Sequence, residues 1–352
     1  MSAWVATLRH RLEGSLVFVF LGLLLVVAAI VSPPFFQPGN LLNILRQASA
    51  IGVLAIGQTL VILAGGIDLS VAATMQLAGV TVAELTGGTN TLVPLVIPLV
   101  LAMGAGIGLV NGLLIAVRRV QPFIATLFVG LLVTGLRLWV TNATPSGLLP
   151  PAVRAFGRGG IGPIPNAVIL FALVAIAASF VLRRTTLGRR IYAVGGNARA
   201  AELSGIRADR VTILSYVLCG LLAAVAGLVL VGYLGYADQE IGTGYDLDSI
   251  AAAVVGGAVL GGGRGKISGT VAGILLMTAL LNLVLILNLK VEYQLVVRGG
   301  VLLAAVAFYS SGWVEKLRGH RAGTASPRNP DRCAGVEEKE VHTATREQPN
   351  NA

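Results

Sequence analysis

The sequence predicts an all-α polytopic membrane protein with about ten transmembrane helices in two inverted five-helix halves and both termini in the cytoplasm. Of its 352 residues, 55% are hydrophobic and 12% are charged, whereas a typical soluble domain has about 25% charged residues. Apolar stretches recur near the roughly 20 residues that a helix needs to cross a bilayer core about 30 Å thick. Arginine and lysine concentrate in alternate gaps between these stretches. These observations exclude most soluble enzymes.

The apolar stretches predict ten spans. The eighth stretch is the shortest and is rich in glycine. Gly104, Gly108 and Gly112 follow a small-xxx-small spacing, which predicts close helix packing in the membrane. The expected spans are roughly 15–31, 41–64, 69–87, 93–117, 121–142, 166–182, 211–232, 247–262, 267–288 and 292–309.

Charge placement predicts the orientation. With the N-terminus inside, the external gaps hold only Arg154, Arg158 and Lys290. Basic residues are retained on the cytoplasmic side during insertion, so both termini are expected inside. The net charge of +10 is then explained by the basic residues that set the topology and that attract the anionic headgroups of the lipid bilayer. No nucleic-acid partner is expected. The expected internal segments hold Arg118, Arg119, Arg183, Arg184, Arg189, Arg190, Arg199, Arg207, Arg210, Arg264 and Lys266.

Composition divides the chain into three parts. Residues 1–14 form a cytoplasmic N-terminal segment, and 15–312 form the transmembrane domain, whose first span we interpret as a retained signal anchor. Residues 313–352 are polar and are predicted to be a disordered cytoplasmic tail. Cys219 lies in a span and Cys333 in the tail, so neither a disulfide nor a metal site is expected.

The internal loop 183–210 is by far the longest cytoplasmic connection and is predicted to contain a short helix. Asn197 is a suitable N-cap, and Gly205 suits the position just after a helix end. A short helix on the cytoplasmic side could dock into a groove of a partner, or it could rest on the lipid headgroups. The candidate docking residues are Asn197, Ala198, Arg199, Ala200, Ala201, Glu202, Leu203, Ser204 and Gly205.

The glycine-rich segment 242–270 resembles a phosphate-binding loop only superficially. Lys266 is followed by Ile267 rather than Ser or Thr, and Leu260 stands where a Walker A loop begins with glycine. We therefore assign Gly256 and Gly257 a structural role. No catalytic constellation is present in the sequence, and no enzyme activity is expected.

Two short segments have similar sequences. Gly66 and Asp68 belong to a Gly-Ile-Asp-Leu segment before the third span, and Gly244 and Asp246 to a Gly-Tyr-Asp-Leu segment before the eighth. The charge rule places the first at the inner end of its span and the second at the outer end, as inverted repeats would. We expect both aspartates to be helix N-caps, with sugar ligation as the alternative.

Four strings carry a family resemblance: ILAGGIDLSVAATM (62–75), VNGLLIAVRRVQPFIATL (110–127), TTLGRRIYAVGGNARAAELSGI (185–206) and GYDLDSIAAAVVGGAVLGGGRGKISGT (244–270). Together they resemble the permease subunit of bacterial ribose/xylose-type ABC sugar importers, in order over residues 15–312. The resemblance implies a bacterial inner-membrane permease that pairs with a second permease subunit, expected to be identical. It further implies two cytoplasmic ATPase subunits and an external sugar-binding protein. In that family the helix at 197–205 is the coupling helix of the ATPase cleft, and ATP and magnesium bind the ATPase, so this chain needs no cofactor.

The resemblance implies alternating access, with a polar pathway for a neutral sugar. Polar residues inside spans tend to face a cavity, although each could equally form a hydrogen bond between helices. The pathway candidates are Gln58, Gln76, Asn111, Thr126 and Asn282.

Two other transport functions remain open from the sequence. A branched-chain amino-acid ABC permease would share the architecture and differ in its pathway residues. An ion-coupled secondary transporter should carry carboxylates deep in the membrane, but here Asp68, Glu84, Asp246 and Asp248 lie near span ends. The sequence does not identify the sugar.

Overall fold

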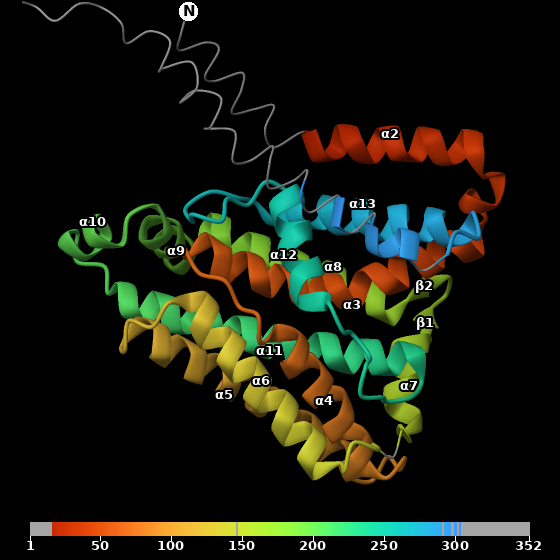
Figure 1. The fold of residues 1–352 in the computed structure, drawn as a ribbon, viewed down its shortest axis with the longest axis horizontal. Helices are drawn as coiled ribbons and strands as arrows, with labels where there is room; N and C mark the ends of the chain where they lie inside the picture. Colours follow the sequence, from red (N-terminus) through yellow and green to blue (C-terminus); the bar gives the residue numbers. More distant parts are fainter. Residues whose placement is uncertain (1–15, 146, 291, 297–298, 301–302, 304–352) are drawn as a thin grey trace, which may run out of the picture. The chain divides into compact units, whose positions relative to one another are not determined.

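Helices make up nearly all the regular structure in the computed structural model, which describes residues 16–145, 147–290, 292–296, 299–300 and 303 (Figure 1). Two short strands, β1 (Gly160–Ile161) and β2 (Ile164–Pro165), form an antiparallel hairpin. The predicted all-α class is therefore confirmed. The helices are α2 (Leu16–Val31), η1 (Pro33–Phe36), α3 (Pro38–Leu63), α4 (Val71–Thr86), α5 (Val93–Ala116), α6 (Pro122–Val140), α7 (Pro151–Arg158), α8 (Asn166–Arg184), α9 (Thr186–Gly196), α10 (Ala198–Leu203), α11 (Ala208–Leu234), α12 (Tyr245–Val255) and α13 (Ile267–Ile286).

Proline and glycine set many of the helix ends. Pro38 and Pro122 occupy the first turns of α3 and α6, where a missing N–H costs no helical hydrogen bond. Gly87 and Gly235 end α4 and α11 with φ of 53° and 86°, a left-handed conformation that favours glycine.

Six helices are long and apolar enough to cross a bilayer: α3, α5, α6, α8, α11 and α13, with 19 to 27 residues and mean hydropathy from 1.4 to 2.5. α2 and α4 are apolar but have 16 residues, about 24 Å of helix. The expected tenth span, 292–309, lies mostly outside the described residues, as do 1–14 and the tail 313–352. A multi-pass membrane protein is confirmed, and the count of ten stays a prediction.

The segment expected to be the eighth span, 247–262, is not one continuous helix. α12 has 11 residues and ends at Val255, and residues 256–266 follow as a glycine-rich irregular loop. The helix stops there because Gly256 packs against the backbone of α13 and Gly257 adopts φ of 92°. The prediction of a full helix over this range is wrong for that reason.

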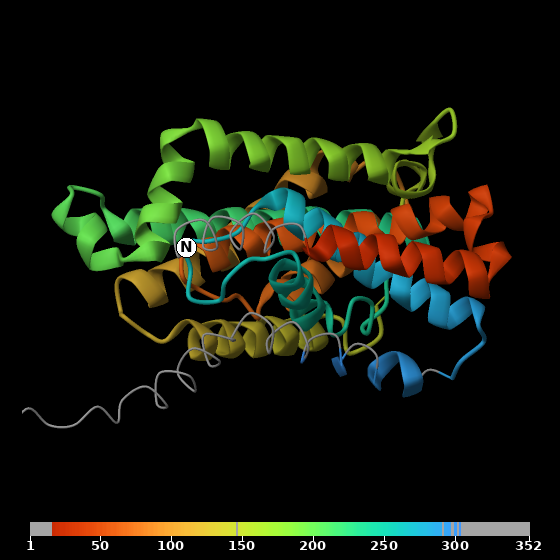
Figure 2. The same cartoon turned by 90° about the horizontal axis from the view of Figure 1, so that it is seen from above.

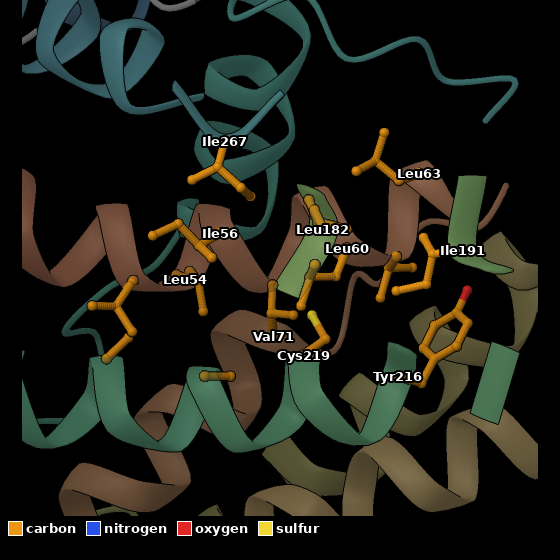
Figure 3. Close-up of a cluster of buried hydrophobic side chains, with 14 of the residues drawn as sticks. Leu54, Ile56, Leu60, Leu63, Val71, Leu182, Ile191, Tyr216, Cys219 and Ile267 are labelled. Carbon is orange, nitrogen blue, oxygen red and sulfur yellow. The ribbon is translucent and has the colours of Figure 1, made fainter. Parts of the chain in front are cut away.

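α3 and α11 form the centre of the bundle (Figures 1 and 2). α11 packs against α3, α4, α5 and α7, and α3 also packs against α8, α12 and α13. A methyl group at Gly104, Gly108 or Gly112 of α5 would overlap the backbone of α11, so the predicted close approach is confirmed. Figure 3 shows part of the shared core, with Leu54 and Leu60 of α3 facing Cys219 of α11.

Many large apolar side chains point away from this core. Leu131 and Trp139 of α6 are 65% and 77% exposed, and Ile176 and Phe180 of α8 are similarly exposed. Contiguous apolar surface of this kind is unfavourable in water and matches a lipid environment.

The two ends of the bundle differ. α9 and α10 lie at one end of the long helices, and α7 with the β1–β2 hairpin lies at the other (Figure 1). The loop segment that the sequence singled out is therefore separated from the hairpin by the full length of α11.

Candidate functional site

The short helix in the loop 183–210 forms where the sequence predicts it. The Asn197 side chain accepts a hydrogen bond from the backbone N–H of Ala200 at 3.0 Å, as an N-cap does. Gly205 follows the helix end with φ of 81°, which confirms the predicted stop. α10 is thus a capped unit of six residues, held at both ends.

The faces of α10 divide its residues into an outer and an inner set. Leu203 is 81% exposed, and Ala200 and Arg199 are also exposed. Glu202 is half-buried and lies 3.9 Å from Arg199. Ala201 is 4% exposed and belongs to the main hydrophobic core. Ala201, one of the candidate docking residues, therefore faces the core and is not on the outer surface of α10.

α9 connects this helix to the core of the bundle. The Tyr192 hydroxyl donates a hydrogen bond to the carbonyl of Gly265, at 2.9 Å. Burial raises the pKa of the Tyr192 phenol, which keeps it a neutral donor. The N–H of Gly263 donates to the carbonyl of Leu63 at 3.0 Å, where α3 ends. The glycine-rich loop after α12 therefore joins α9 to the end of α3, a mechanical link that the sequence did not predict.

Three of the pathway candidates, Gln58, Asn111 and Thr126, converge on the turn between α3 and α4, residues 64–70. The Gln58 amide, oriented to satisfy both groups, donates to the carbonyl of Asp68 at 3.1 Å and accepts from its N–H at 3.2 Å. The Asn111 side chain of α5 donates to Ser70 Oγ at 2.8 Å. Gln58 and Asn111 are fully buried, so they fix this turn in the conformation seen here.

Two further side chains complete the same cluster. Thr126 of α6 accepts a hydrogen bond from the N–H of Leu69 at 3.1 Å and is fully buried. Tyr216 of α11 donates from its hydroxyl to the carbonyl of Ile67 at 3.0 Å. The turn is thus hydrogen-bonded by helices that lie far apart in the sequence.

Asp68 lies at the centre of this turn and is 1% exposed. Its Oδ1 accepts from the N–H and hydroxyl of Ser70 at 2.9 and 2.6 Å. Its Oδ2 and the side-chain oxygen of Asn111 have no hydrogen-bond partner in the described part of the chain. The structure makes Ser70 the N-cap of α4 and Gly244 the N-cap of α12. The prediction that Asp68 and Asp246 are N-caps is wrong, because α4 begins after the Asp68 turn has closed and α12 begins before Asp246.

The other two pathway candidates lie elsewhere. Gln76 of α4 is half-buried and donates to the hydroxyl of Thr243, in the loop before α12, at 3.3 Å. Asn282 of α13 forms a reciprocal amide pair with Asn40 of α3, with both bonds at 3.0 Å. Asn282 therefore acts in this conformation as a contact between helices.

Gly66 and Gly244, the glycines of the two similar segments, are required for different structural reasons. A side chain at Gly66 would overlap the Tyr216 hydroxyl, so glycine lets that hydroxyl reach the turn. Gly244 adopts φ of 85° and starts α12. The sequence reasoning selected these glycines but missed Tyr216, because a single tyrosine in an apolar span forms no pattern.

Arg137 is a second polar residue that the sequence reasoning missed. It is 4% exposed in α6 and donates from Nη1 to the carbonyl of Gln239 at 2.7 Å. Gln239 in turn donates to the hydroxyl of Thr141 at 2.7 Å. A buried arginine in an apolar helix is costly without partners, and that cost was the signal available in the sequence. This cluster holds the loop between α11 and α12 against α6.

The chemistry of these groups is that of hydrogen bonding and docking. In the part of the chain that the structure describes, no group of three His, Cys, Asp or Glu side chains is placed to hold a metal ion. A bundle of apolar helices, a buried hydrogen-bonded turn and a capped short helix together define a multi-pass membrane protein.

Comparison with known proteins identifies the class. The family described as branched-chain amino acid transport system / permease component matches residues 40–306. The ribose import permease of Escherichia coli (strain K12) is 45% identical over 292 residues, covering 80% of this chain and 90% of that relative. The ribose import permease of Bacillus subtilis (strain 168) is 42% identical, with 82% and 90% covered. The L-arabinose ABC transporter permease of Azospirillum brasilense is 36% identical, with 84% and 87% covered.

The chain therefore belongs to this family of transport permease components. No solved structure matches it.

Proposed function

We propose that this protein is the membrane-spanning permease subunit of an ABC importer that carries a monosaccharide such as ribose or xylose. The observation that carries the proposal is the 45% identity to a ribose import permease over 80% of the chain. A relative described as a galactofuranose transporter permease, 36% identical over 315 residues, supports the wider class of sugars. The substrate would pass between helices without chemical change.

The proposed topology has ten spans in two inverted halves, with both termini inside a bacterial inner membrane. The packing supports it, because α11 contacts α4 and α5, while α3 contacts α12 and α13. If α3, α4 and α5 correspond to α11, α12 and α13, the contacts of α11 with α4 and α5 match the contacts of α3 with α12 and α13. α12 is then the short second-half counterpart of α4, as broken helices in inverted-repeat transporters are.

The five pathway candidates differ in how exposed their side chains are. Gln76 is the one that is only half-buried, and its amide meets Thr243 at the loop before α12. We assign contact with the sugar to Gln76. Gln58, Asn111, Thr126 and Asn282 are buried in hydrogen bonds, and they would hold the wall of the pathway and reach the solute only in another conformation.

The partners in this proposal are two ABC ATPase subunits, a second copy of this permease and an external sugar-binding protein. ATP and magnesium would bind the ATPase subunits, so hydrolysis takes place outside this chain. α10 would dock in the ATPase through Ala200 and Leu203, which are exposed at the end of the bundle. The link from α9 through the glycine-rich loop to the end of α3 would pass the motion into the membrane.

The test is uptake by proteoliposomes that contain the permease, its ATPase and the sugar-binding protein. Leu203→Asp places a charge on the docking face and is expected to lower sugar uptake at least about tenfold, since a buried unpaired charge at an interface is costly. Leu203→Met keeps the apolar contact and serves as the control. Uptake by Leu203→Asp within twofold of the control would show that α10 does not couple the ATPase to transport.

A branched-chain amino acid is the second candidate substrate, because the matching family is described by that transport system. Uptake of labelled ribose, xylose and leucine under identical conditions separates the two. Sugar uptake with no leucine uptake is the expected result, and the reverse would reassign the substrate.

A further inference from the structure

A cavity of about 280 Å³ opens between α9, the end of the α10 segment and the first turn of α11. Its lining consists of Arg190, Gly205, Arg207, Arg210 and Val211. Three of these five residues carry a guanidinium group, so the cavity is strongly positive.

The acidic residues of the loop 183–210 lie near arginines that do not line the cavity. Glu202 lies 3.9 Å from Arg199, and Asp209 lies 3.4 Å from Arg119 in the loop between α5 and α6. These two are the only acidic residues in the loop 183–210. No ion pair joins Arg190, Arg207 or Arg210 to another residue that the structure describes, so the positive charge of the cavity is available to an external anion.

The depth of the cavity along α11 indicates what that anion is. Arg207 and Arg210 stand where the loop ends, and Val211 begins the apolar part of the 27-residue α11. The apolar side of the lining is Val211, which is 5% exposed, and the exposed side chain of Leu214 follows one turn further along α11. A phospholipid presents the same sequence of groups, a phosphate followed by acyl chains, at the edge of the membrane core. A soluble anion or an acidic protein surface would not require the apolar side of the cavity.

We propose that the cavity binds the phosphate of an anionic phospholipid headgroup in the cytoplasmic leaflet. Arginine binds phosphate with several charge-assisted hydrogen bonds in a fixed fork. Here Arg190 belongs to α9, Arg207 is the residue before α11, and Arg210 lies in the first turn of α11. The bound headgroup joins the two helices that flank α10 and fixes the docking helix relative to the central helix. The cytoplasmic leaflet rests on the orientation given under the proposed function.

The experiment measures binding of phosphatidylglycerol and phosphatidylcholine to the purified full chain by native mass spectrometry in detergent. Phosphatidylglycerol is expected to bind and phosphatidylcholine to bind much more weakly. The double variant Arg207→Gln/Arg210→Gln should bind phosphatidylglycerol roughly 30-fold more weakly, because each arginine near an anionic headgroup contributes about fivefold. Both side chains are exposed, so the variant should fold, and its melting temperature in phosphatidylcholine alone checks this.

The matched control is Arg183→Gln/Arg184→Gln, which removes the same charge from exposed positions at the end of α8, outside the cavity. Its affinity for phosphatidylglycerol should stay within twofold of the wild type. An equal loss in both double variants, or equal binding of both lipids, would overturn the site. Displacement of the lipid by an equal concentration of glycerol 3-phosphate would assign the cavity to a soluble anion.

A second arm addresses the ATPase as an alternative occupant. If Arg207→Gln/Arg210→Gln abolishes ATPase binding and leaves phosphatidylglycerol binding unchanged, the arginines contact the ATPase and the lipid proposal is wrong. These measurements need no transport, so their failure is distinguishable from failure of the proposed function, which the uptake assay tests.

Discussion

The two Gly-x-Asp-Leu segments of this chain are alike in sequence and different in structure. In the first, Asp68 is 1% exposed and accepts hydrogen bonds from Ser70 and Asn111. In the second, Asp246 is half-buried, and its side chain makes no hydrogen bond to another residue that the structure describes. The first segment is locked inside the bundle, whereas the second begins a short helix at its edge.

This difference shows that two segments with similar sequences need not have the same structural role. The first segment lies within the turn 64–70, to which side chains of α3, α5, α6 and α11 all form hydrogen bonds. The second is preceded by a loop whose Thr243 meets Gln76. We infer that the first segment is held firmly in the bundle and that the second is held less firmly. Four substitutions test this inference, with effects that should decrease in the order given.

The largest effect is expected from Asp68→Ala. The change leaves the N–H and hydroxyl of Ser70 without their acceptor in a buried site. Each unsatisfied buried donor costs roughly 1–3 kcal/mol, so the free energy of unfolding should fall by on the order of 4 kcal/mol. Thermal unfolding of the purified protein in detergent measures it. Asp68→Asn keeps one acceptor oxygen and should fall between the wild type and Asp68→Ala.

Asn111→Leu should have the next largest effect. It removes the amide that donates to Ser70 Oγ at 2.8 Å and to Asp68 Oδ1 at 3.4 Å, and it places a larger apolar group in a tight site. We expect a loss of about 2 kcal/mol by the same unfolding measurement. A loss as small as that of an exposed substitution would mean that the turn is not fixed by α5.

Sequence reasoning found this turn in part. It selected Gly66, Asp68, Gln58, Asn111 and Thr126 separately, because glycines, amides and carboxylates are conspicuous in apolar spans. It could not bring them together, since their convergence depends on how α3, α5 and α6 cross. It also made Asp68 an N-cap, because a carboxylate before a helical run fits that role locally.

The loop 183–210 was better predicted because its determinants are local. Asn197 and Gly205 lie at the two ends of one short helix, so the helix and its limits could be read from neighbouring residues. The inward turn of Ala201 and the contact of Tyr192 with Gly265 required the packed structure. The glycine-rich loop failed as a predicted span because Gly256 packs closely against α13, and because Gly257, Gly262 and Gly263 adopt positive φ, which does not continue a helix.

Tyr216→Phe tests the hydrogen bond that Tyr216 of α11 donates to the turn. The change removes the hydroxyl that donates to the carbonyl of Ile67 and leaves the ring in place. We expect a loss of about 1 kcal/mol in the free energy of unfolding. An unchanged melting temperature would show that α11 is not coupled to the turn through this bond.

The smallest effect on stability is expected from Asp246→Ala, the counterpart of Asp68→Ala. Asp246 lies in the first turn of α12, where a carboxylate interacts favourably with the helix dipole by about 0.5 kcal/mol when exposed. The free energy of unfolding in detergent should therefore change by no more than about 0.5 kcal/mol. Asp68→Ala should change it by several times as much in the same assay. The two residues occupy equivalent positions in the two Gly-x-Asp-Leu segments. A difference between the stability losses of the two variants therefore reflects the surroundings of each residue alone. Equal losses in the two variants would mean that the start of α12 is held as firmly as the turn before α4, and the distinction between a firmly held and a less firmly held segment would have to be abandoned.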